Sequence, residues 1–271
     1  MKKFTYLFFI LFLFNTWLAA AEAQEMEEII YIAENERRMP AFRIGTGLGF
    51  SFSGYRDETD LPLNRYNNSF ALIFDGNIEN EKFLYSFNSN VSFGKNKSIK
   101  IDINDNYFSY FQKESNSIRA SFENALDYRL WGNDVFPGYL GGGLKFDIYF
   151  VHLPETFYYN LTAVLSLNAH ASQKWIINSK NTFVFSASLP VFGYSIRPPY
   201  YGLLYSPLDF AMDFVSLHNY WALFSDVKYN HKINNLISFY ANLGAELSHI
   251  NFPQPRKEAL LRLNAGISFT F

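Results

Sequence analysis

Two groups of residues in this sequence have types and spacings that could support chemistry. His170 and Ser172 stand two residues apart, and on a β-strand such residues project from the same face. A proton could then pass from the serine hydroxyl to the imidazole, as nucleophilic hydrolysis requires. The second group places charges of both signs at alternate positions of another segment: Arg119, Glu123, Asp127 and Arg129.

Charges at alternate positions of a strand have two possible uses. Along a water-filled channel they would set its ion preference, whereas in a narrow interior they would pair into a neutral network that fills the space. Further charged residues are expected on inward faces: Lys145, Asp147, Glu246, Glu258 and Arg262. The other histidines are scattered and form no pair with metal-ligand spacing, so we predict neither a metal site nor a cofactor.

The elements that must position these residues are β-strands. In the last segment, apolar residues alternate strictly with mostly polar ones, and the apolar set is Leu261, Leu263, Ala265, Ile267, Phe269 and Phe271. The same alternation recurs from Ala41 onward in eleven segments, with strand-breaking residues between them. We expect none of the ten prolines in the middle of a strand.

The composition limits the classes of function. The chain is 20% aromatic, yet its mean hydropathy is only −0.09, which suits strands with one apolar and one polar face. Its 23 Lys and Arg residues are balanced by 25 Asp and Glu, so we expect no nucleic acid as a partner. The absence of cysteine excludes disulfides and Cys-based metal sites.

The first residues are typical of a targeting segment. Lys2 and Lys3 precede a short apolar run, and Ala21 and Ala23 fit the small-residue rule for cleavage. We therefore predict a signal peptide at residues 1–23, a charged leader at 24–40 and one barrel domain at 41–271. No later segment approaches the 18 consecutive apolar residues of a spanning helix.

Three features favour a membrane barrel over the alternative, a secreted soluble β-protein. The polar faces of the segments are unsuited to a sandwich core, and Trp and Tyr residues gather at segment ends, as at a membrane interface. The closing strand, which ends on Phe271, also resembles that of bacterial outer-membrane β-barrels. The resemblance implies outer-membrane location, contact with outer-membrane lipid, and recognition of Phe271 by the barrel-assembly machinery.

A sheet immersed in lipid must close into a barrel, and single-chain bacterial barrels have an even number of strands. We therefore expect an all-β antiparallel barrel of about twelve strands, with ten as the alternative. A twelfth strand could come from Ile29–Ile32 or from residues 194–217. A barrel of this size favours the filled interior, because wide channels need about 16 strands.

Residues 194–217 are expected to form a long outer loop. The stiff, aromatic stretch around Arg197, Tyr200 and Tyr201 argues against disorder. This loop could constrict the lumen or contact a partner. The alternatives are a lid packed over the rim, or a hidden strand.

The sequence around His170 also resembles outer-membrane phospholipase A, a barrel enzyme with a His-x-Ser pair and a downstream Asn. The resemblance implies lipid hydrolysis by His170 and Ser172. The chain departs from that family because Gln173 and Lys174 stand where it has Asn-Gly, and because the alternation turns His170 and Ser172 inward. We therefore expect a non-enzymatic barrel, either a narrow pore for small solutes or a plugged structural or binding barrel. A lipid-modifying enzyme is the alternative.

Overall fold

The computed structural model describes residues 41–57, 64–98, 114–152, 159–197, 211–217, 219–251 and 255–271. The predicted signal peptide, the leader and Ile29–Ile32 lie outside the described residues. No helix in the described part of the chain is long and apolar enough to cross a membrane. The described residues form eleven β-strands: β1 (Ala41–Asp57), β2 (Asn64–Glu79), β3 (Phe83–Ser98), β4 (Ser115–Trp131), β5 (Gly138–His152), β6 (Tyr159–Ile176), β7 (Asn181–Arg197), β8 (Ala211–Ser216), β9 (Tyr220–Lys232), β10 (Ile237–Ile250) and β11 (Arg256–Thr270).

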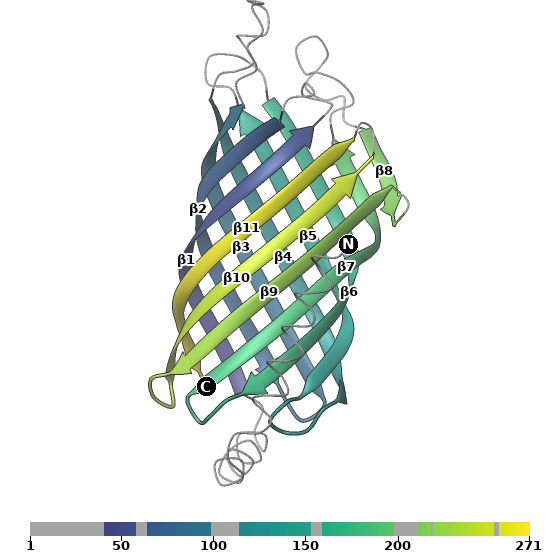
Figure 1. Cartoon of the computed structure of the whole chain (residues 1–271). Coiled ribbons are helices and arrows are strands. Elements are labelled where there is room, and N and C mark those ends of the chain that lie inside the picture. The colour runs from purple at the N-terminus through teal and green to yellow at the C-terminus, as the bar shows by residue number, and fades with distance from the viewer. Residues whose placement is uncertain are drawn as a thin grey trace, which may run out of the picture.

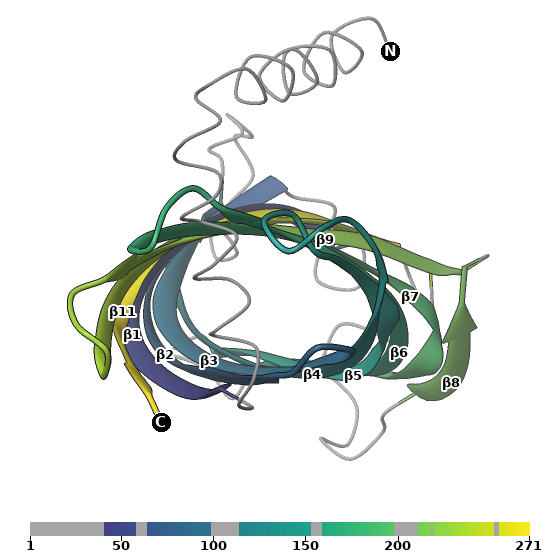
Figure 2. The ribbon, with the colours of Figure 1, turned by 90° about the horizontal axis from the view of Figure 1, so that it is seen from below.

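Ten of these strands form one closed antiparallel barrel (Figures 1 and 2). Strands β1 to β7 are neighbours in chain order, β7 pairs with β9, and β11 closes the ring against β1. Within the described residues β8 pairs with β7 alone and stands outside the ring. The predicted transmembrane β-barrel is confirmed, but the ring has the alternative count of ten strands. The favoured count of twelve was wrong because the strand hidden in residues 194–217 does not join the ring.

The two faces of the barrel wall differ as the alternation predicts. Outward side chains are apolar and exposed, such as Phe50 at 59% and Leu72 at 50%, whereas inward neighbours such as Asn67 are 5% exposed. Exposed apolar side chains recur around all ten strands of the ring. A continuous apolar surface of this kind needs lipid around it, and the pairing of β11 with β1 removes the two edges that an open sheet would expose to that lipid.

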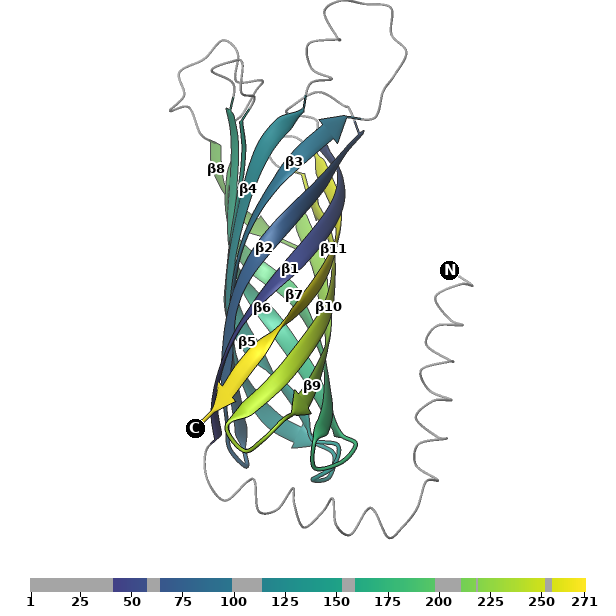
Figure 3. The ribbon, with the colours of Figure 1, turned by 90° about the vertical axis from the view of Figure 1, so that its left-hand side faces the viewer.

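The two ends of the barrel also differ. Figure 3 shows the hairpin turns and the C-terminus at one end. Each turn there is short and contains an Asn whose side-chain oxygen accepts hydrogen bonds from backbone N–H groups two and three residues on: Asn80, Asn133, Asn178 and Asn234. The two longest connections, residues 99–114 and 198–210, lie at the opposite end. Short turns mark the periplasmic end of barrels in this class.

Strand β7 changes partner part-way along its length. Its segment 181–188 pairs with β9, whereas its segment 192–197 pairs with β8. Pro190 lies at the changeover, where it has no N–H to donate, and the pairing with β6 shifts register between Leu167 and Asn168. The expectation that no proline lies inside a strand was therefore wrong for Pro190, which marks a bulge.

Candidate functional site

The outer half of the lumen contains a network of charges that joins opposite walls. Arg119 on β4 donates from Nη2 to Glu246 Oε1 on β10 at 2.8 Å and from Nη1 to Glu258 Oε1 on β11 at 2.9 Å. Arg256 Nη2 donates to Glu258 Oε2 at 3.0 Å. Lys145 Nζ lies 3.4 Å from Asp147 Oδ2 and 3.7 Å from Glu246 Oε2. We call these six residues the central charge cluster: Arg119, Lys145, Asp147, Glu246, Arg256 and Glu258.

The central charge cluster is neutral and well packed. Its three cations face three carboxylates, and its side chains are between 1% and 15% exposed. Rings fill the remaining space, because Arg256 stacks 4.6 Å from the Tyr149 ring and 5.2 Å from the Tyr55 ring, while Lys145 Nζ lies 3.1 Å over Phe224. These ion pairs offset the cost of burying the charges, while Lys145 Nζ makes ion-pair and ring contacts but no hydrogen bond within the described residues.

A cluster of buried apolar side chains lies beside these charges and contacts Lys145 through Phe224. Its members come from β6, β8, β9 and β10 and are at most 9% exposed: Val164, Val215, Tyr220, Ala222, Phe224 and Ile250. Tyr220 is therefore buried. Its position at a strand end had suggested that its ring would lie at the membrane interface. These buried side chains and the central charge cluster both lie toward the outer ends of their strands.

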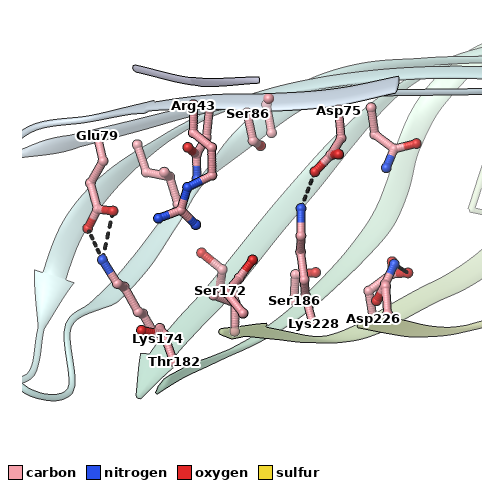
Figure 4. Close-up of a pocket in the computed structure, with 18 of the residues that line it drawn as sticks. Arg43, Asp75, Glu79, Ser86, Ser172, Lys174, Thr182, Ser186, Asp226 and Lys228 are labelled. Atoms are coloured by element: carbon pink, nitrogen blue, oxygen red, sulfur yellow. Dashed lines mark hydrogen bonds and ion pairs between the residues drawn. The ribbon is translucent and has the colours of Figure 1, made fainter. Parts of the chain in front are cut away.

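The periplasmic half of the lumen is open by comparison. It contains a cavity of about 210 Å³ that reaches the β6–β7 turn at Asn178 and the start of β10 at Ser238. Two ion pairs bridge the cavity from wall to wall (Figure 4): Lys174 Nζ lies 2.9 Å from Glu79 Oε2, and Lys228 pairs with Asp75. We call this cavity the periplasmic cup.

Glycines make room for Tyr240, which lies against one of the residues that line the cup. Gly45, Gly47 and Gly266 lie beneath the ring of Tyr240, and a Cβ on Gly47 would lie 2.5 Å from Tyr240 Oη. Lys228 Nζ in turn lies 4.3 Å over the Tyr240 ring. Because glycine carries no side chain, Tyr240 can lie across β1 and β11 and hold Lys228 toward Asp75 on the opposite wall.

His170 and Ser172 both face the cup. His170 Nδ1 lies 2.6 Å from Asp127 Oδ2, and Asp127 is fully buried. Within the described residues, Ser172 Oγ is buried without a hydrogen-bond partner, so it is not bonded to His170. The relay that lipid hydrolysis would require is therefore not formed, and the pair lies away from the lipid-facing surface.

The other sequence-predicted site residues are placed as follows. Arg262 lines the cup, Glu123 accepts a hydrogen bond from Ser188 Oγ at 3.1 Å, and Arg129 pairs with Asp134 near the β4–β5 turn. Arg119, Asp127, Lys145, Asp147 and Glu246 belong to the contacts described above. The structure thus divides the predicted set, placing part of it in the central charge cluster and part around the cup, with Arg129 in neither.

The predicted loop at residues 194–217 had its boundaries too wide. Arg197 is the last residue of β7 and is fully buried, and 211–216 form β8. Tyr200 and Tyr201 lie outside the described residues. Phe271 is 73% exposed, and its backbone N–H donates to Phe42 O at 2.8 Å beside the first strand.

Sequence reasoning missed the residues that bridge the cup. Asp75, Glu79, Lys174 and Lys228 all lie on the polar parity of their strands, so alternation placed them inside. Their pairing joins strands that are not neighbours in the ring, and only the curvature of the closed barrel brings such residues together.

The fold is similar to that of solved bacterial proteins. The outer membrane protease OmpT from Escherichia coli is similar with a TM-score of 0.50 and 8% identity, over 85% of this chain and 97% of that one. The fold is that of a bacterial outer-membrane β-barrel. The translocator domain of the autotransporter NalP from Neisseria meningitidis has a TM-score of 0.43 and 9% identity, over 93% and 97% of the two chains. OprG from Pseudomonas aeruginosa has a TM-score of 0.36 and 9% identity, over 86% and 96%.

No family model matches the chain, and no curated protein matches its sequence. At such low identities the structural likeness concerns the fold alone. The exposed apolar belt and the closed ring agree with that fold, and together they place this chain in the bacterial outer membrane.

Proposed function

We propose that this chain is a closed, non-enzymatic outer-membrane barrel that presents a binding cup to the periplasm. In the described residues, charged side chains pair across the outer half of the lumen, whereas the periplasmic half contains the cup, and this contrast supports a closed barrel. Of the functions considered from the sequence, this is the plugged binding barrel rather than the small-solute channel.

The contact that carries this proposal is the link between Arg119 and the two carboxylates of Glu246 and Glu258, since it joins β4 to β10 and β11 across the barrel. A pore selective for one sign of ion would keep unbalanced charge along a wetted path. Here the charges balance, and Lys145 and Glu246 are only 1% and 3% exposed. The arrangement supports filling rather than conduction.

A liposome-swelling assay tests the closed barrel. Folded wild-type protein in liposomes should give no swelling with small sugars beyond protein-free liposomes. A charge-balanced quadruple variant, Arg119→Ser, Glu246→Ser, Arg256→Ser and Glu258→Ser, removes two cations and two carboxylates and should admit the sugar. Swelling by the wild type as fast as by this variant would contradict the proposal.

A further inference from the structure

The periplasmic cup has more positive than negative charge. Six Lys and Arg side chains line it, against four Asp and Glu. Two cations are already matched by the bridges Lys174–Glu79 and Lys228–Asp75. Lys180 is exposed in the β6–β7 turn, whereas Arg43 lies between the barrel walls, where charges interact more strongly than in bulk water.

Arg43 stands between the two bridges. Its guanidinium projects from β1 into the cavity, facing Ser172 on the opposite wall (Figure 4). Its Nε is buried and has no hydrogen-bond partner among the described residues. A buried donor without a partner costs free energy, so a ligand that accepts a hydrogen bond here would stabilise the site.

Hydroxyl groups surround the same space. Ser86 lies on the wall that carries Arg43, while Ser172 and Ser186 lie on the facing wall (Figure 4). Ser172 is 5% exposed, and its Oγ also lacks a partner among the described residues. A cation with a rigid fork of donors and a facing hydroxyl donor are the groups that bind an oxyanion.

We propose that the periplasmic cup binds a small oxyanion, either phosphate or the carboxylate of a short molecule, with Arg43 as its main contact and Ser172 as a second donor. The cavity, of about 210 Å³, is large enough to admit a molecule of this class. The inference rests on the proposed function in taking the cup as a binding site, and it adds the class of ligand and the residues that select it.

Isothermal titration of the folded protein in detergent micelles tests this inference, with inorganic phosphate and acetate as separate probes. Wild type should bind at least one of them, and phosphate binding with no acetate binding would assign the phosphate class. Arg43→Gln should weaken binding about tenfold or more, because a charge-assisted hydrogen bond is lost. Arg129→Gln is the matched control, since Arg129 lies at the same end of the barrel but outside the cup, and its affinity should stay at the wild-type value.

Two further variants keep the test decisive. Arg43→Lys retains the charge without the fork and should lose less affinity than Arg43→Gln, and Ser172→Ala should weaken binding several-fold. Folding of each variant is checked by its heat-dependent gel mobility. Wild-type affinity in both Arg43 variants, or binding of neither anion by a folded wild type, would overturn the inference. Swelling of wild-type liposomes would instead contradict the closed barrel alone, because the titration reads the cup independently.

Discussion

Arg119 and Glu246 lie on opposite walls of the barrel and meet across its lumen at 2.8 Å. Glu246 is 3% exposed, so its carboxylate depends on Arg119 and Lys145 in place of water. This contact therefore ties together β4 and β10, two strands that are distant in the ring.

Removing one member of this pair should destabilise the barrel. Arg119→Met leaves two buried carboxylates without their main partner and should lower the free energy of unfolding by about 3–5 kcal/mol. Replacing a charge-balanced set, as Arg119→Met and Arg256→Met with Glu246→Leu and Glu258→Leu, should restore much of that loss. Urea titration followed by heat-dependent gel mobility measures both, and a single variant as stable as wild type would contradict the network described here.

The glycine beneath Tyr240 should not tolerate a side chain. A Cβ at Gly47 would lie 2.5 Å from both Tyr240 Oη and Ala265 O, so Gly47→Ala should cost roughly 1–3 kcal/mol through overpacking. Gly54→Ala on the same strand is the control, because its nearest atom would be 4.0 Å away. Equal urea midpoints for the two variants would show that Tyr240 does not depend on this glycine.

The free-energy cost of placing a charge on the outward face should depend on how deep the residue lies in the membrane. Leu72 is half exposed near the middle of β2, whereas Phe83 begins β3 at the turn end. Leu72→Lys should cost about 2–4 kcal/mol and Phe83→Lys about 0–1 kcal/mol in folding into lipid vesicles. If the two costs were the same, the apolar belt would not be centred on the middle of the strands.

His170 should matter for stability rather than for catalysis. His170→Ala leaves the fully buried Asp127 without its imidazole partner, which should cost about 1–3 kcal/mol. Phospholipid micelles incubated with wild-type protein should show no fatty-acid release above a Ser172→Ala control. Release that disappears in both Ser172→Ala and His170→Ala would instead support the lipid-modifying alternative.

The wall of the barrel could be predicted from the sequence because alternation is a local property. The parity that put Leu72 outside and Arg119 inside needs only neighbouring residues, and so does the inward placement of His170. The strand number was harder to predict. Strand β7 continues through Pro190 and the bulge beside it, although proline is expected outside strands. Strand β8 lies outside the ring.

The interior contacts could not be predicted because they depend on ring closure. Alternation places Lys228 and Asp75 inside, but they come from β9 and β2, 153 residues apart in the chain. The register of all ten strands, and the shape of the barrel's cross-section that results from it, determine which inward side chains come into contact. The same holds for Arg43, whose place between two bridges follows from strands that are distant in sequence.

Planar-bilayer recording of the folded, unboiled protein tests the central claim most directly. The filled outer lumen predicts a baseline without discrete conductance steps, while the charge-balanced quadruple variant of Arg119, Glu246, Arg256 and Glu258 should show them. Steady, reproducible steps from the wild-type protein, of a size comparable to those of the variant, would contradict a closed barrel and make the inward charges part of an ion path.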